Sequence, residues 1–249
     1  MKTAQDFIIE IPVLKTSDQI TKARQILRDD MFREVYVVDA KKILVGYIDL
    51  TDGLRVTATK SNVTVEGFVK DAPVVRPEDS IEQVAKTMRS FHTDSVAVAD
   101  SLHHLLGGVI LSALFPVIIS RNELHGTVAS RMNGNVVTAN PDDELLKAQA
   151  LNLESGFTSF PVIKKKRLVG MISRRDLISS KKVRSAIAQH AHTTIGDVMT
   201  REVVTIAPDE PVSYAAELLV KHDVSRLPVL KGETLVGIID RHNILAALA

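Results

Sequence analysis

The sequence contains no cysteine and no tryptophan, and aromatic residues occupy only 4% of its 249 positions. Without cysteine the chain can form neither disulfides nor thiolate metal sites, which fits a reducing compartment such as the cytoplasm. Charge is nearly balanced, with 31 Lys and Arg against 30 Asp and Glu, so no overall field attracts nucleic acid. The scarcity of aromatic side chains also argues against base stacking on a single strand.

Long hydrophobic runs are missing as well. An uncharged apolar run extends over residues 105–119, but it is shorter than the ~20 residues that a membrane span needs. It also contains a glycine pair and Pro116. We therefore expect a buried strand that leads into a helix, and no membrane partner.

One short phrase occurs four times in the chain: a leucine, a variable residue, a glycine and two apolar residues, followed by a short stretch that is polar in three of the copies. Its glycines, Gly46, Gly108, Gly170 and Gly237, are 62, 62 and 67 residues apart. So regular a period is typical of duplicated supersecondary units. The copies are Leu44-Val45-Gly46-Tyr47-Ile48-Asp49, Leu106-Gly107-Gly108-Val109-Ile110-Leu111, Leu168-Val169-Gly170-Met171-Ile172-Ser173 and Leu235-Val236-Gly237-Ile238-Ile239-Asp240.

Each copy predicts the order β-α-β-β-α, and the fourth shows it most clearly. Its β-branched run at residues 203–206 predicts a strand, and Pro208 begins a helix. Residues 224–230 and 234–239 predict two further strands, and a closing helix begins near Asp240. The fold class is therefore α/β, built from α+β repeats.

One such repeat is too small to bury its own faces, so we expect the repeats to pack in pairs. The predicted first pair occupies residues 1–120, with repeats near 7–58 and 68–117. The second occupies residues 121–249, with repeats near 128–184 and 194–249. The segment from Pro116 to Val128 is the predicted link.

A second repeated segment gives the chain a family resemblance. Copy four reads Ser225-Arg226-Leu227-Pro228-Val229 before its glycine phrase, and copy three reads Thr158-Ser159-Phe160-Pro161-Val162. The first two copies carry Tyr36 and Ala97 where the proline stands. With this order and spacing, nearly the entire chain resembles the cystathionine β-synthase (CBS) domain family.

The resemblance implies a function. Two CBS repeats form one module, and such modules bind adenosine nucleotides or related ligands in clefts between repeats, usually to regulate another protein. The γ subunit of AMP-activated protein kinase also has four repeats. We thus expect a non-enzymatic regulatory protein without a further cofactor. Its candidate ligands are AMP, ADP, ATP and S-adenosylmethionine, and its protein partner is a second copy or an unknown regulated protein.

The family's ribose is held by an Asp in a Ser/Thr-x-x-Asp segment after the last strand, because a carboxylate accepts charge-assisted hydrogen bonds. The partner repeat supplies a Thr or Ser before its first strand and an apolar–polar pair before the Leu-Pro-Val strand. Neighbouring cations would meet a phosphate. For the cleft between repeats 3 and 4, the expected nucleotide-binding residues are Ser173, Arg174, Arg175, Asp176, Thr200, Val224 and Ser225.

A second interpretation of Ser173 and Asp176 stays open. Ser-x-x-Asp at a helix start is close to a capping box, in which Ser caps the helix and the acid reaches back. A cap does not account for Thr200, Val224 and Ser225, which is why we favour the nucleotide site.

Two further clefts are weaker candidates. One would combine Asn133, Phe157 and Thr158 of repeat 3 with Asp240 and Asn243 of repeat 4. The other would combine Asp49 and Asp52 with Thr93 of repeat 2, where Asp94 adds an unfavourable acid beside a phosphate. Repeat 2 itself, with Leu111 and Leu114 at the ribose positions, cannot hold a ribose in this way.

Other kinds of site are less well supported. The basic stretch at residues 164–184 fits a solvated hairpin, a phosphate contact or, less well, a nucleic-acid patch. The eight histidines are scattered and predict no metal site. Four repeats leave no room for a catalytic domain, so we expect no catalytic residues. Besides a ligand sensor, a protein scaffold with vestigial clefts and a nucleic-acid-associated protein remain as alternatives.

Overall fold

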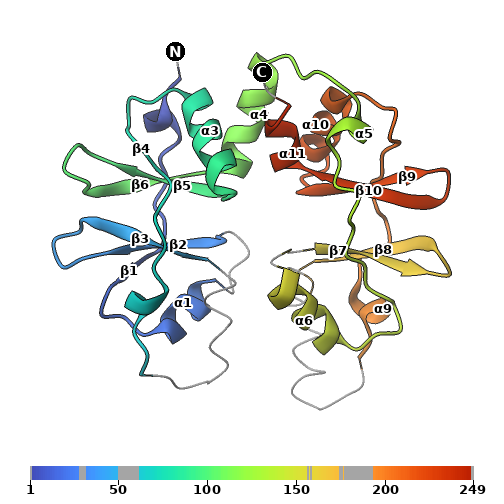
Figure 1. Cartoon of the computed structure of the whole chain (residues 1–249), viewed down its shortest axis with the longest axis horizontal. Helices are drawn as coiled ribbons and strands as arrows, with labels where there is room; N and C mark the ends of the chain where they lie inside the picture. The colour runs from blue at the N-terminus through green and yellow to red at the C-terminus, as the bar shows by residue number, and fades with distance from the viewer. Residues whose placement is uncertain are drawn as a thin grey trace. The chain divides into compact units, whose positions relative to one another are not determined.

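The computed structural model describes residues 2–27, 32–49, 62–155, 157, 159–173, 176 and 193–247. The chain divides into two compact units, residues 1–122 and 123–249, and each contains two repeats (Figure 1). Arg174, Arg175, Thr158 and Asp52, which belong to the expected sites, lie outside the described residues.

The described residues of unit 1 form two three-stranded sheets, ordered β1-β2-β3 and β4-β5-β6. In each sheet the first pairing is parallel and the second antiparallel. Figure 1 shows α1 on the outer side of one sheet and α3 on the outer side of the other. The elements are η1 (Ala4–Phe7), β1 (Val13–Lys15), α1 (Ile20–Ile26), β2 (Glu34–Val38), β3 (Leu44–Asp49), η2 (Val65–Phe68), β4 (Val74–Val75), α3 (Ile81–Phe91), β5 (Ser95–Ala99), β6 (Leu105–Ile110) and α4 (Leu111–Arg121).

In unit 2 the part of the chain that the structure describes forms one four-stranded antiparallel sheet, ordered β7-β8-β10-β9. The two repeats meet in this sheet where Arg167 of β8 pairs with Thr234 of β10. The predicted α/β class is confirmed in both units. The elements of unit 2 are α5 (Val128–Arg131), α6 (Leu145–Ser155), β7 (Ser159–Lys164), β8 (Arg167–Ser173), α9 (Ile195–Val198), α10 (Val212–Lys221), β9 (Arg226–Lys231), β10 (Thr234–Asp240) and α11 (Arg241–Leu245).

The strand predicted at residues 203–206 is wrong in extent, because only Ile206 forms a bridge, to Val229. The signature proline gives the reason. In repeat 2, the Ala97 amide donates to the Pro73 carbonyl at 2.9 Å and extends the parallel ladder. The equivalent residue in repeat 4 is Pro228, which has no N–H, so the ladder stops after one bridge.

The apolar run at residues 105–119 forms β6 and then α4, as predicted. Helix α4 continues through Pro116 to Arg121, so the connection between units begins at Asn122, later than predicted. Among the described residues, no helix has the length and apolarity that a bilayer crossing requires.

The segment that precedes each repeat lies on the partner repeat. Thr200, which precedes repeat 4, exchanges two backbone hydrogen bonds of 2.8 and 2.9 Å with Met171 of repeat 3. Ile195 and Met199 of this segment are buried in the core of repeat 3. Equivalent bridges join Ile9 to Gly108, Tyr47 to Lys70 and Asn133 to Ile238. The leading segment of one repeat therefore contributes to the packing of the other, and the two repeats form one compact unit.

These crossings explain the repeated glycine. A Cβ on Gly170 would stand 2.7 Å from Met199 Sδ and 2.8 Å from the Thr200 carbonyl oxygen. Real Cβ atoms essentially never approach so closely, so either the crossing segment or the strand would have to move. The repeated glycine thus marks where a neighbouring backbone passes over each strand.

The register of β6 corrects our alignment of repeat 2. Val98 pairs with Gly107, just as Val37 pairs with Gly46 in repeat 1. A Cβ on Gly107 would meet the Ile9 carbonyl oxygen at 2.6 Å, which is the contact that the other phrase glycines make with their crossing segments. Gly107, not Gly108, is therefore the phrase glycine, and the true spacings are 61, 63 and 67 residues.

The corrected alignment moves the ribose positions of repeat 2 by one residue. They become Ile110, the last residue of β6, and Ala113 in α4, in place of Leu111 and Leu114. Since both are apolar, this repeat still offers no carboxylate for a ribose.

Candidate functional site

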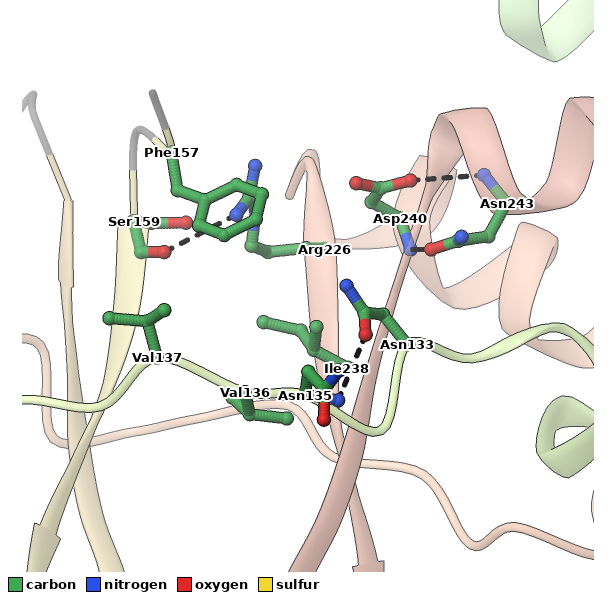
Figure 2. A pocket seen from close by; sticks show the side chains of 10 residues that line it. All are labelled: Asn133, Asn135, Val136, Val137, Phe157, Ser159, Arg226, Ile238, Asp240 and Asn243. Carbon is green, nitrogen blue, oxygen red and sulfur yellow. Dashed lines mark hydrogen bonds between the residues drawn. The ribbon is translucent and has the colours of Figure 1, made fainter. Parts of the chain in front are cut away.

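Unit 2 has a pocket of about 60 Å³ between its two repeats (Figure 2). The pocket brings together four of the five residues predicted for the second cleft: Asn133, Phe157, Asp240 and Asn243. The fifth, Thr158, lies outside the described residues. The complete lining consists of Asn133, Asn135, Val136, Val137, Phe157, Ser159, Arg226, Ile238, Asp240 and Asn243.

Asn133 is fixed by the segment crossing. Its backbone exchanges hydrogen bonds of 2.8 and 3.0 Å with Ile238 of β10. Its side-chain oxygen accepts a hydrogen bond from the Asn135 amide at 2.9 Å. Figure 2 shows the side-chain nitrogen directed into the pocket, where it can donate to a ligand.

Asp240 and Asn243 cap the start of α11 and still present polar atoms to the pocket. The Asn243 amide donates to Asp240 Oδ1 at 3.0 Å, and the Asp240 amide donates to Asn243 Oδ1 at 2.9 Å. Neither of these bonds uses Asp240 Oδ2 or Asn243 Nδ2. Because the cap and a ligand would use different atoms, the two roles are compatible.

Arg226 brings a buried positive charge to the pocket. Only 9% of the residue is exposed, and its guanidinium carbon lies 5.7 Å from the centre of the Phe157 ring. Its Nη1 donates to the Ser159 carbonyl oxygen at 3.3 Å. The Ser159 hydroxyl is buried without a hydrogen-bond partner among the described residues. A buried guanidinium beside an unsatisfied hydroxyl favours an anionic group.

Sequence reasoning missed Ser159 and Arg226. Each is the first residue of its strand, β7 or β9, and directly follows the apolar–polar pair of the family pattern. That position relates the two residues by the pseudo-twofold symmetry of the repeats. The sequence could have identified them by comparison of the residue that follows the apolar–polar pair in repeat 3 with the same residue in repeat 4.

The first predicted cleft is described only in part. Asp176 Oδ2 accepts hydrogen bonds from the Ser173 amide at 2.7 Å and from the Ser173 hydroxyl at 2.6 Å. The Asp176 amide approaches Ser173 Oγ at 3.3 Å, so the capping arrangement is present. Thr200 pairs with Met171 of β8, which precedes Ser173 by two residues. Among the described contacts, none links Val224 or Ser225 to these residues.

In the third predicted cleft, acidic side chains form ion pairs with basic side chains of the protein. Lys70 Nζ lies 2.7 Å from Asp49 Oδ2, and Arg33 Nη1 lies 2.7 Å from Asp94 Oδ2. The Thr93 hydroxyl is buried and has no hydrogen-bond partner among the described residues. Because Asp49 and Asp94 are already paired with Lys70 and Arg33, their charges attract a ligand less strongly.

Beside this cleft, an acid is buried between repeats 1 and 2. Glu34 is 5% exposed, and its two oxygens accept hydrogen bonds from the Asp94 amide at 3.0 Å and from the Ser95 hydroxyl at 2.8 Å. Burial, aided by repulsion from Asp94, raises the pKa of Glu34 to about 7. Burial also raises the pKa of Tyr36, whose hydroxyl is 3.0 Å from Ser95 Oγ.

The comparisons with known proteins agree with this architecture. The CBS domain model matches residues 126–182 and 195–249. Protein MJ1225 from Methanocaldococcus jannaschii is 20% identical over 100% of this chain and 98% of its own length. Its crystal structure, presented as that of a proposed archaeal homolog of γ-AMPK, matches with a TM-score of 0.77 over 98% of this chain and 99% of that one, at 18% identity.

Some relatives match only about half of this chain. An inosine-5'-monophosphate dehydrogenase from Korarchaeum cryptofilum is 28% identical over 112 residues, which are 44% of this chain but 22% of the enzyme. The structure of CBSX2 in complex with AMP covers 49% of this chain and 96% of its own, with 28% identity and a TM-score of 0.44. Residues 126–182 and 195–249 therefore match the CBS domain in sequence, and along nearly its whole length the chain shares the fold of protein MJ1225.

Proposed function

We propose that this chain is a non-enzymatic regulatory protein that binds an adenosine nucleotide between repeats 3 and 4 and signals by a change in how its modules pack. The observation that carries the proposal is the pocket of unit 2. It combines a carboxylate, three asparagine side chains, an aromatic ring and a buried arginine within one small space. These are the groups needed to meet the ribose, base and phosphate of a nucleotide.

Each part of the ligand has a partner in this pocket. Asp240 Oδ2 and Asn243 Nδ2 face the ribose hydroxyls, with the carboxylate supplying the stronger, charge-assisted bond. The Ser159 hydroxyl and the Arg226 guanidinium meet the phosphate. Phe157 offers its ring to the base. This assignment uses only atoms that the capping bonds of α11 leave available.

Binding requires the pocket to open. The volume of about 60 Å³ is far below the roughly 300–1,000 Å³ of ordinary ligand pockets. The Arg226 guanidinium lies over the same Phe157 ring that the base would contact. On binding, Arg226 leaves the ring for the phosphate and the base takes its place. The ligand thus selects an open arrangement by its higher affinity for that arrangement, which is how binding becomes a signal.

The cleft of Ser173 and Asp176 is the second site of the same pair in our proposal. There Asp176 would hold the ribose, Thr200, Val224 and Ser225 would line the base, and Arg174 or Arg175 would meet the phosphate. The bonds within the cap engage Asp176 Oδ2, and a ribose would use Oδ1. The signal is passed to a second copy of the chain or to a regulated protein.

A thermal-shift and calorimetric screen with AMP, ADP, ATP and S-adenosylmethionine tests the proposal. A ligand at a hundred times its Kd adds about 2.7 kcal/mol of stability, which raises the melting temperature of a chain of this size by roughly 2–4 °C per kcal/mol. Loss of the shift in Asn243→Ala would assign the described pocket, and loss in Asp176→Ala would assign the other cleft. No shift with any of the four ligands would refute the nucleotide site.

The alternative function is a protein scaffold, and the ion pairs of unit 1 favour it for that unit. The pairs of Asp49 with Lys70 and of Asp94 with Arg33 neutralise acids of the expected cleft. A nucleic-acid role is less well supported, because in the basic hairpin Lys164 pairs with Asp142 and Arg167 with Glu233. Salt-dependent binding of an oligonucleotide would favour it.

A further inference from the structure

Unit 1 holds its two repeats together through a side chain that can gain or lose a proton. We propose that Glu34 forms a proton-responsive contact between repeats 1 and 2, which is tight when the carboxyl group is neutral and weakened when it is ionised. The inference concerns unit 1 alone and does not depend on the nucleotide site of unit 2.

The geometry makes Glu34 the centre of this contact. Its side chain comes from β2 of repeat 1, and the donors to both of its oxygens come from repeat 2. The Ser95 hydroxyl lies between Glu34 and the hydroxyl of Tyr36, at 2.8 and 3.0 Å. Glu34 and Tyr36 therefore hold Ser95 from two sides, and these bonds cross from one repeat to the other.

The charged groups around Glu34 do not favour its ionised form. Tyr36 stands on the same strand, and Arg33, which directly precedes that strand, contacts Asp94 at 2.7 Å. From repeat 2, Asp94 adds a like charge that raises the pKa of Glu34 further, while Arg33 lowers it by less. On the neighbouring strand β3, Asp49 pairs in register with Glu34 and contacts Lys70, and Tyr47 faces Tyr36. The carboxylate is thus desolvated next to another acid.

The hydrogen-bond chain can serve both protonation states. When Glu34 is ionised, Tyr36 donates to Ser95 and Ser95 donates to Glu34. When Glu34 is protonated, its own hydroxyl donates to Ser95, and Ser95 donates to Tyr36. The neutral form keeps the bonds without a buried charge, so it holds the two repeats more firmly. Ionisation leaves the bonds but adds the cost of burying a charge.

The direction of the pH effect follows from linkage. The pKa of Glu34 is about 7 in the folded chain against an ordinary value of 4.5. A group whose pKa is raised by folding stabilises the folded state fully below its unfolded pKa and loses this effect as pH rises through the folded pKa. The contact should therefore weaken between about pH 5 and pH 8, a range that includes neutral pH.

Carbon-13 NMR of the glutamate carboxyl groups in the full chain tests the titration directly. We expect one resonance with a midpoint near pH 7, which disappears in Glu34→Gln. Melting temperatures measured from pH 5 to pH 8 should fall by several degrees more in the wild type than in Glu34→Gln, whose amide imitates the neutral acid. Glu82→Gln, at an exposed position of α3, is the matched control and should keep the wild-type profile.

The hydroxyl of Ser95 gives a second test that a purely structural role would not pass. Ser95→Ala removes the donor that stabilises the ionised carboxylate, so the Glu34 midpoint should move upward by a measurable fraction of a pH unit. A Glu34 midpoint below pH 5.5 would overturn the proposal. So would a midpoint near 7 with identical pH profiles of melting in wild type and Glu34→Gln.

Discussion

The two units place opposite charges at equivalent positions. In unit 1 the first residues of β2 and β5 are Glu34 and Ser95, and in unit 2 the first residues of β7 and β9 are Ser159 and Arg226. In both units the serine of one repeat meets the charged residue of the other. The same fold thus holds a buried acid in one unit and a buried base in the other. The first residue of one of these strands therefore sets the charge that is buried between two repeats.

The positions next to this axis extend the contrast. Arg33 and Asp94 face each other as an ion pair in unit 1, whereas the equivalent residues of unit 2 are Thr158 and Ser225. The charges at these two positions of unit 1 are therefore paired within the protein. Unit 2 keeps Arg226 beside a pocket, with polar atoms that its capping bonds do not use. This difference agrees with the ligand site that we propose in unit 2 and with the scaffold alternative that we give for unit 1.

Reversing the charge of Arg226 in unit 2 should have the largest effect on stability and on AMP binding. Arg226→Glu buries an acid near Asp240, and an uncompensated buried charge costs about 3–5 kcal/mol. Urea denaturation should show this loss for unit 2, and calorimetry should show no AMP binding to the described pocket.

The variant Arg226→Gln removes the charge and keeps much of the side-chain volume. It should weaken AMP binding by roughly 10- to 150-fold, the worth of a charged hydrogen bond, and leave adenosine little affected. Equal losses for AMP and adenosine would contradict a phosphate contact.

Removing the acid of unit 1 should have the next largest effect. Since the pKa of Glu34 is raised from 4.5 to about 7, the shift corresponds to at most roughly 3 kcal/mol of stability lost between pH 5 and pH 8. Glu34→Gln should abolish this loss, which denaturant titrations at the two pH values would measure. Arg226→Gln, its counterpart in unit 2, should leave the pH dependence unchanged.

Crowding the segment crossings tests a feature that both units share. Gly170→Ala would press a methyl group against Met199 and the Thr200 carbonyl, and we expect a loss of about 1–3 kcal/mol. Gly67→Ala is the control, because no atom lies within 4 Å of the added carbon there. Thermal melts of the two variants should differ by several degrees. Equal melts would mean that the crossing segment adjusts freely.

Changes to the helix caps of unit 1 should have the smallest effect on stability. Ser80 accepts a hydrogen bond from the Gln83 amide at 3.2 Å at the start of α3, whereas Gln19 at the start of α1 makes no such side-chain bond. Ser80→Ala should cost about 1 kcal/mol. Gln19→Ser should stabilise repeat 1 by a similar amount at most. Chemical denaturation resolves both changes, and a neutral Ser80→Ala would show that the cap is not needed.

Much of the fold could be predicted because its signals are local and repeated. The glycine phrase, the β-branched runs and the helix starts each depend on neighbours along the chain. The one-residue error at Gly107 arose because the second of two adjacent glycines fits the phrase better, and only strand pairing identifies the first as the equivalent residue. Residues 203–206 do not form the predicted strand because Pro228, which lies on the neighbouring strand β9, has no N–H to pair with them.

The site was harder to predict, for a different reason. Asp240 and Asn243 stand at a recognisable helix start, so the sequence could identify them as candidates. Ser159 and Arg226 carry no motif of their own and become informative only when two repeats are placed face to face. The same holds for Glu34, which reads as an ordinary charged residue until its burial between repeats is known.

The crossing of segments has a practical consequence for anyone who edits this chain. Residues 3–9 complete repeat 2, through the bridges of Thr3 with Ser80 and Ile9 with Gly108, and not the repeat that directly follows them. A deletion or bulky fusion at the amino end would therefore damage structure about a hundred positions away. The smallest piece that can be moved between proteins, by an engineer or by gene duplication, is a pair of repeats together with its leading segment.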